Sequence, residues 1–185
     1  VDNPFGTPVP NPELTERGQT ECSANIPLRL YEVSGVLPRA YVVPGEVQEA
    51  DLGRAVDLWL SKGFDASRLA IVEGPPMGGG GPGTASIESE RSREVVVRAD
   101  APQGGTLVLL DSYDPGWVAE MDGKTVPVLR ANALFRGIRL PPGRHVVRFR
   151  YEPASFRVGA SISVAALLLT IGLLAWRRRE RSEAE

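Results

Sequence analysis

The sequence of 185 residues contains one cysteine, Cys22, and one histidine, His145. A single cysteine excludes an intrachain disulfide, and one cysteine with one histidine excludes the usual zinc sites. A cysteine nucleophile would need a basic partner, but His145 lies far away in a strand pattern. We interpret Cys22 as an incidental thiol in an N-terminal loop and His145 as a strand residue with satisfied hydrogen bonds. The sequence therefore indicates no metal site and no cofactor.

Positive charge in excess is also absent. The net charge is −2, and Lys62 and Lys124 are the only lysines, so nothing indicates a nucleic-acid partner. Hydrophobic residues make up 42% and charged residues 24%, which is typical of a globular chain. The length suffices for one domain with a core and a small annex.

The sequence has no initiator methionine and no charged segment followed by an apolar one, which an export signal would require. We expect that Val1 is not the native start and that transmembrane segments precede it. The alternative is a tail-anchored protein with a cytosolic domain.

A long apolar run lies near the C-terminus. Residues 158–176 carry no charge, and as a helix they would span about 28 Å, against roughly 30 Å of hydrocarbon. Their Leu, Ile and Val residues favour insertion by roughly −4 kcal/mol. Phe156 and Trp176 stand at interfacial positions. We predict a transmembrane helix over residues 156–176, with the lipid bilayer as partner, rather than a buried core helix.

Arginines at positions 177, 178, 179 and 181 follow this run. They predict a cytoplasmic tail at residues 177–185 and an extracytoplasmic domain at a bacterial cell membrane. Arginines also precede the run, but they belong mostly to a predicted strand, and folded domains cross membranes largely regardless of charge.

Composition shifts divide the rest of the chain. Residues 1–26 read as an irregular lead-in, and residues 27–74 as a small αβ annex. In the annex we expect strands at 28–33 and 39–43 and a helix after Gly45 that ends at Gly63. Residues 75–83 read as a flexible Gly/Pro linker. A phosphate-binding loop is excluded there because no Gly-Lys-Ser/Thr follows.

Residues 84–155 predict a β-sandwich, so that the fold is mainly β with a short helical appendage and one C-terminal transmembrane helix. Short apolar or alternating runs separated by Gly/Pro turns indicate the strands. The expected strands are 84–90, 94–99, 106–110, 117–121, 125–130, 134–140 and 144–151, with Asp122-Gly123 as a hairpin turn.

One turn is dense in aspartates and aromatics. Asp111, Tyr113, Asp114 and Trp117 surround Pro115-Gly116 at one end of the expected sandwich. A sugar ring stacks on aromatic side chains while carboxylates accept its hydroxyls, so these four residues form a candidate glycan-binding site.

The alternative is a structural turn, in which the aromatics cap the core and the aspartates bind backbone amides, and this reading is favoured. A glycosidase pair is a weaker interpretation because such carboxylates usually come from different strands. The spacing also does not match a calcium loop.

The segments 111–117 (DSYDPGW) and 121–159, with an Asp-Gly hairpin, Phe-Arg, Pro-x-Gly-x-His and Tyr-x-Pro, resemble the C-terminal portion of YfhO-like bacterial membrane proteins. The upstream segment 28–43, which contains Leu-Pro-Arg-Ala, is similar to another part of that family.

The resemblance implies a polytopic protein of the membrane glycosyltransferase type, which transfers sugars from polyprenyl-phosphate carriers to cell-envelope glycopolymers. This chain would then be a C-terminal extracytoplasmic accessory domain plus the last transmembrane helix. Its partners would be upstream transmembrane helices and an envelope glycan or polyprenyl-phosphate sugar. Catalytic acids are expected in early loops that this chain lacks, so no catalytic residue is assigned. The alternative function is a non-enzymatic membrane-anchored β-sandwich for binding or adhesion.

Overall fold

The computed structural model describes residues 14–21, 27–33 and 36–182, which belong to two units. In the first unit, β1 (Leu14–Glu21) pairs antiparallel with β2 (Pro27–Val33). Residues 14–21 belong to the segment 1–26, which is expected to be irregular because it is rich in Pro, Asn, Thr and Glu. The backbone pairing along β2 makes this polar segment a strand. Cys22 lies outside the described residues.

The second unit begins at Arg39 and contains the remaining elements. Their bounds are β3 (Ala40–Val43), β4 (Gly45–Gln48), α1 (Leu52–Trp59), β5 (Leu69–Val72), β6 (Thr84–Arg91), β7 (Glu94–Ala101), β8 (Gly105–Ser112), β9 (Trp117–Met121), β10 (Lys124–Val126), β11 (Leu129–Ala131), β12 (Phe135–Leu140), β13 (Gly143–Tyr151) and α2 (Ala154–Ser182).

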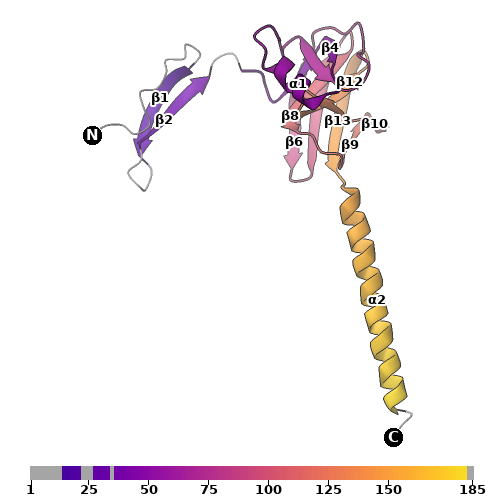
Figure 1. Cartoon of the computed structure of the whole chain (residues 1–185). Coiled ribbons are helices and arrows are strands. Elements are labelled where there is room, and N and C mark those ends of the chain that lie inside the picture. The colour runs from indigo at the N-terminus through magenta and orange to yellow at the C-terminus, as the bar shows by residue number, and fades with distance from the viewer. Residues whose placement is uncertain (1–13, 22–26, 34–35, 183–185) are drawn as a thin grey trace. The chain divides into compact units, whose positions relative to one another are not determined.

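Two sheets face each other in this unit (Figure 1). One has five strands in the order β10-β9-β13-β7-β6, and the other has six in the order β3-β8-β12-β11-β5-β4. All pairings are antiparallel except that of β4 with β5. The predicted mainly β fold with a short helix and one long C-terminal helix is confirmed.

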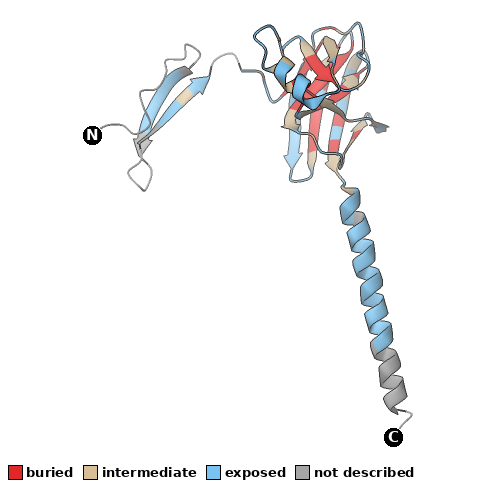
Figure 2. Cartoon of the chain, in the orientation of Figure 1, coloured by how far each residue is buried: buried red, intermediate tan, exposed pale blue. Residues whose placement is uncertain are grey.

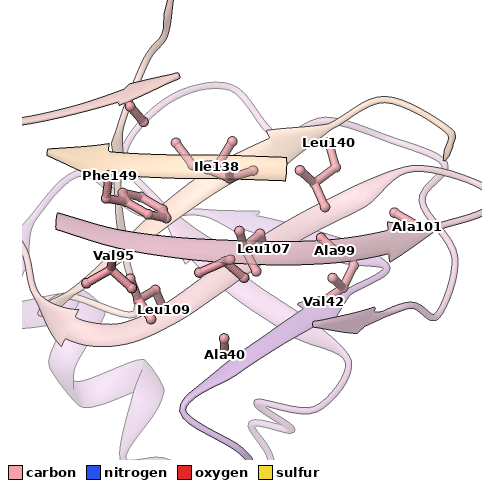
Figure 3. Close-up of a cluster of buried hydrophobic side chains, with 13 residues drawn as sticks. Ala40, Val42, Val95, Ala99, Ala101, Leu107, Leu109, Ile138, Leu140 and Phe149 are labelled. Atoms are coloured by element: carbon pink, nitrogen blue, oxygen red, sulfur yellow. The ribbon is translucent and has the colours of Figure 1, made fainter. Parts of the chain in front are cut away.

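The core lies between the sheets, where alternate residues of each strand point inward. Figure 2 shows the buried residues concentrated in the strands. The five-stranded sheet contributes Phe149 and Val97. The six-stranded sheet contributes Leu107, Ile138 and Leu140. None of these side chains is accessible to solvent. Figure 3 shows side chains of both sheets in this cluster. The apolar alternation in the sequence is what predicts this core.

The segment expected as a separate annex, residues 27–74, is divided between the two units. Its β2 belongs to the hairpin, whereas β3, β4 and β5 are strands of the six-stranded sheet. The helix α1 connects β4 to its parallel neighbour β5. Trp59 of α1 contacts Phe135 of β12 edge to face, with ring centres 5.7 Å apart. The annex strands therefore extend the sandwich itself.

The expected strand 125–130 is two strands in different sheets. β10 pairs with β9 in the five-stranded sheet, and β11 pairs with β12 and β5 in the six-stranded sheet. Pro127 stands between them and has no backbone N–H to continue a ladder. The proline is where the chain passes from one sheet to the other.

The Gly/Pro segment 75–83 contacts the sandwich closely. A Cβ atom at Gly80 would lie 2.5 Å from the carbonyl oxygen of Pro44, and one at Gly83 would lie 2.5 Å from that of Asp100. Gly83 also forms a β-bridge with Val42. At these positions glycine is required because the backbone of the sandwich approaches too closely for a side chain.

Glu46 holds this segment in place from β4. Its side chain is 1% exposed, and it accepts hydrogen bonds from the Thr106 hydroxyl at 2.7 Å, the Met77 N–H at 2.6 Å and Arg139 Nη2 at 2.9 Å. Burial would raise the pKa of Glu46, but the bonds from Arg139, Thr106 and Met77 outweigh it and hold the pKa below its ordinary value.

The helix α2 has 29 residues, and Ala154–Leu173 within it is long and apolar enough to cross a membrane, with a mean hydropathy of 1.8. None of these residues is buried against the rest of the described chain, and Figure 2 shows this part of α2 as exposed. An apolar surface of this size is stable only in contact with other apolar groups, and its length and composition match the hydrocarbon of a bilayer.

Gly80→Ala should lower the free energy of unfolding by about 1–3 kcal/mol, because the added methyl overlaps the Pro44 carbonyl. Gly78→Ala is the matched control, since nothing lies within 4 Å of its Cβ position, and it should change stability by no more than about 0.5 kcal/mol. Urea denaturation of the chain in detergent micelles, followed by tryptophan fluorescence, measures both. Equal effects would contradict close contact of the glycine segment.

Candidate functional site

The predicted turn lies at the end of the sandwich from which α2 starts (Figure 1). The N–H of Glu152 donates to the carbonyl of Gly116 at 2.7 Å, and the N–H of Tyr151 donates to that of Arg93 at 3.0 Å. Residues 91–93, 112–117 and 151–153 therefore share one end, which we call the helix-side end. Because α2 begins at Ala154, this end is the one nearest the membrane segment.

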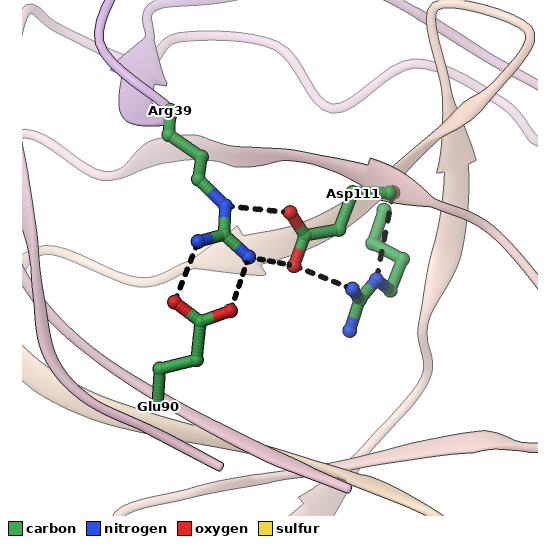
Figure 4. A network of polar contacts seen from close by, with 4 residues as sticks. Arg39, Glu90 and Asp111 are labelled. Atoms are coloured by element: carbon green, nitrogen blue, oxygen red, sulfur yellow. Dashed lines mark hydrogen bonds and ion pairs between the residues drawn. The ribbon is translucent and has the colours of Figure 1, made fainter. Parts of the chain in front are cut away.

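Asp111, at the end of β8, is bound by two arginines. Arg39 donates from Nε to Oδ1 at 2.7 Å and from Nη2 to Oδ2 at 3.0 Å. Arg136 of β12 donates from Nη2 to Oδ2 at 2.7 Å. Arg39 also donates to both carboxylate oxygens of Glu90, at 2.7 and 2.9 Å. Figure 4 shows Arg39 between Glu90 and Asp111. We call these four residues the arginine–carboxylate cluster.

The cluster joins the two sheets and shifts the pKa values of Arg39, Glu90 and Arg136. Glu90 belongs to β6 of the five-stranded sheet, whereas Asp111 and Arg136 belong to the six-stranded sheet. Hydrogen bonds to Glu90 and Asp111 raise the pKa of Arg39, and the bond from Arg39 lowers the pKa of Glu90. Burial lowers the pKa of Arg136, with Asp111 opposing that effect.

Trp117, at the start of β9, lies over the rim of the core. The Arg136 guanidinium stacks on its indole ring, with Cζ 3.8 Å from the ring centre. Arg136 is only 3% exposed, and its Nη1 makes no hydrogen bond with any described residue. The indole therefore takes the place of a hydrogen-bond partner on that side of the cation. Tyr151 contacts the same indole, with ring centres 5.2 Å apart.

Asp114 and Tyr113 make separate contacts. The Gly116 N–H donates to Oδ1 of Asp114 at 2.7 Å, which closes an Asx turn. Burial and then the charge of the neighbouring Asp114 raise the pKa of Tyr151. Tyr113 lies under Arg130, whose Cζ is 5.0 Å from its ring centre. Asp114 is exposed, and Tyr113 is half-buried.

The structure thus brings the four predicted residues to one end but gives them different contacts. Asp111 and Trp117 meet through Arg136, while Tyr113 has its own partner, Arg130. The sequence reasoning did not identify Arg39, Glu90 or Arg136 as site residues. Their bonds join positions 25 to 72 residues apart in the chain, and no local pattern signals such pairing. Asp114 accepts a hydrogen bond from a backbone amide, as the structural turn would have it, whereas Asp111 accepts from two arginine side chains instead.

A second feature lies on the five-stranded sheet. A groove of about 470 Å³ is lined by polar residues that include Arg98, Arg144 and His145. His145 Nδ1 lies 2.7 Å from Asp122 Oδ2, and Nε2 lies 3.0 Å from the Pro141 carbonyl. The bond from His145 and that from the Val146 N–H lower the pKa of Asp122. Both ring nitrogens are engaged, as expected for a satisfied strand residue.

Among the described residues, no three His, Cys, Asp or Glu side chains are grouped so that they could hold a metal ion.

The fold and the helix-side end define the class of protein, which is a β-sandwich joined directly to a helix that can cross a membrane.

Comparison with known proteins narrows this class. Residues 84–163 match the family described as bacterial membrane protein YfhO. Over 65 residues the chain is 32% identical to a Bacillus subtilis (strain 168) protein described as "Uncharacterized protein YfhO". That match covers 35% of this chain and 8% of the B. subtilis protein, so the chain corresponds to a small part of that relative's length. No solved structure matches. Over the sandwich and the start of α2 the chain is therefore similar to YfhO-like bacterial membrane proteins.

Asp111→Asn should lower the free energy of unfolding by about 3 kcal/mol, because it leaves the buried Arg136 guanidinium without its counter-charge. Glu88→Gln is the matched control, since Glu88 pairs with Arg98 where both side chains are about half exposed, and it should cost no more than about 1 kcal/mol. Urea denaturation in micelles compares them. A loss no larger than that of the control would show that the cluster does not stabilise the fold.

Proposed function

We propose that the chain is the C-terminal accessory domain and last transmembrane helix of a YfhO-like membrane protein, and that the domain assists glycosyl transfer from polyprenyl-linked sugars to cell-envelope glycopolymers. The observation that carries this proposal is the family match, which runs without interruption from the sandwich into α2. The hydrogen bonds of Tyr151 and Glu152 support it, since they hold the sandwich against the start of the helix.

In this role the helix-side end would receive the sugar chain close to the bilayer. Asp114 presents an exposed carboxylate and Tyr113 a half-buried ring beside it in sequence, which suits hydroxyl and ring contacts to a sugar. Asp111 and Trp117 are occupied by Arg136, so we assign them the positioning of the turn. The second candidate, a binding or adhesion module without an enzyme, shares this surface.

The glycan-binding role predicts a change in Trp117 fluorescence when envelope oligosaccharides are added. The protein would be the chain in micelles with Trp59→Phe and Trp176→Phe, which leaves Trp117 as the single reporter. Asp114→Asn keeps the oxygen that binds the Gly116 N–H but removes the charge, and it should weaken binding about tenfold. Arg144→Gln, in the groove on the five-stranded sheet, is the control and should leave binding unchanged.

No fluorescence change with any glycan would remove the binding role. Binding that is lost in Arg144→Gln but kept in Asp114→Asn would place the sugar in the groove instead. Transfer activity of the parent protein without glycan binding by this domain would leave bracing of the upstream helices as its contribution.

The proposal also places the sandwich on the extracytoplasmic side, because a group of arginines follows the apolar part of α2. Single cysteines in a Cys22→Ser background, expressed within the full open reading frame, test this. A membrane-impermeant maleimide added to intact cells should label Lys124→Cys and not Ser182→Cys. The reverse pattern would put the sandwich in the cytoplasm and exclude a role in envelope glycan transfer.

A further inference from the structure

The turn between β6 and β7 lies against the start of α2. Ser92 and Arg93 form this turn, and the Arg93 carbonyl accepts the hydrogen bond from the Tyr151 N–H at 3.0 Å. The Arg93 guanidinium lies over the ring of Phe156, with Cζ 5.9 Å from the ring centre. Phe156 belongs to the first turn of α2.

This contact fixes the depth of the turn relative to the bilayer. The apolar span begins at Ala154, so Phe156, whose side chain is 65% exposed, occupies the position of an interfacial aromatic. A guanidinium about 6 Å from that ring lies at the level of the lipid headgroups, where the phosphates are. Arg91 precedes the same two-residue turn and pairs with Glu94 across the hairpin.

Arg91 and Arg93 differ from the other arginines of the five-stranded sheet. Each of the others has a carboxylate oxygen within 3.4 Å: Arg98, Arg144, Arg148 and Arg150. Arg91 and Arg93 are exposed, and neither forms an ion pair with any residue in the described part of the chain. Two arginines without an ion-pair partner among the described residues are thus placed at the membrane surface.

A pocket of about 320 Å³ lies between this turn and the helix, and it is lined by Arg93, Tyr151, Glu152, Pro153 and Phe156. The aromatic rings and the proline give it apolar walls beside the Arg93 guanidinium, which forms no ion pair with the residues that the structure describes. The carboxylate of Glu152, which would repel an anion, lies 3.1 Å from Nε of Arg150. A group that is part anion and part hydrocarbon matches this lining.

We propose that Arg91 and Arg93 bind the phosphate of a membrane lipid, and that the pocket beside Phe156 takes the adjoining glycerol and upper acyl chain. The ligand class is an anionic phospholipid of the leaflet that faces the sandwich. The proposal needs the membrane anchor but not the glycan-binding role, and it holds for either orientation of the chain in the membrane.

The depth of the turn is tested with the full chain in nanodiscs of phosphatidylcholine and phosphatidylglycerol. A fluorophore on Ser92→Cys in a Cys22→Ser background should be quenched strongly by a nitroxide on the lipid headgroup. The same label on Lys124→Cys, the first residue of β10 beyond the other end of β9, should be quenched several-fold less. Equal quenching at the two positions would overturn the proposal.

The role of the arginines is tested by titrating short-chain phosphatidylglycerol into the Ser92→Cys chain in neutral micelles and following the label. The double variant Arg91→Gln/Arg93→Gln should bind at least tenfold more weakly. The charge-retaining variant Arg91→Lys/Arg93→Lys should keep most of the affinity, and Arg98→Gln, an exposed arginine of β7, should keep all of it.

Inorganic phosphate separates a lipid site from a site for the free anion. It should bind at least tenfold more weakly than phosphatidylglycerol, because it cannot fill the apolar part of the pocket. Equal affinity for inorganic phosphate would overturn the assignment to lipid. Unchanged phosphatidylglycerol affinity in Arg91→Gln/Arg93→Gln would overturn the assignment to these arginines.

Discussion

The carboxylate of Asp111 between two guanidinium groups is the interaction on which the helix-side end depends. Its side chain is 14% exposed and that of Arg136 is 3% exposed, so neither charge could be buried there without the other. Through Arg39 and Glu90 the same cluster joins β6 to the opposite sheet. Removing Asp111 would therefore affect the position of Trp117 as well as the contact between the two sheets.

Near the start of β8, the buried carboxylate of Glu46 likewise ties separate segments of the chain together. Glu46 accepts bonds from Thr106, Arg139 and the Met77 backbone, and these bonds fix the glycine-rich segment across the sandwich. The two carboxylates are anchored to opposite ends of one central strand, since Thr106 lies near the start of β8 and Asp111 near its end. In each case an arginine of β12, Arg136 or Arg139, supplies the counter-charge.

The sequence predicted the parts of this structure that follow from local patterns. Alternating apolar residues give the strands and core of 84–155, and an uncharged run gives the membrane helix, because burial and insertion act on neighbouring residues. The turn at 111–117 was recognised from Pro115-Gly116, and its placement beside the helix follows from the pairing of β13. The ionic partners of Asp111 were not predictable, since Arg39 lies 72 residues away along the chain.

The amino-acid composition of a segment did not predict its structure where contacts with distant segments determine it. Residues 75–83 have the composition of a flexible linker, yet Gly80 and Gly83 are glycine because other backbone segments contact them. The polar strand β1 is held by pairing with β2 and has no apolar signal of its own. The annex strands β3, β4 and β5 could not be assigned to the sandwich, because their place in the sheet depends on pairing with distant strands rather than on their own residues.

Only Glu152 and Pro153 separate the last strand from α2. Two residues span at most about 7 Å even when fully extended, so the domain has no slack with which to swing away from the bilayer. A ligand bound to the domain therefore moves with it in the plane of the membrane. Any membrane component that contacts the sandwich would therefore reach it by lateral diffusion, within a layer no thicker than the sandwich itself.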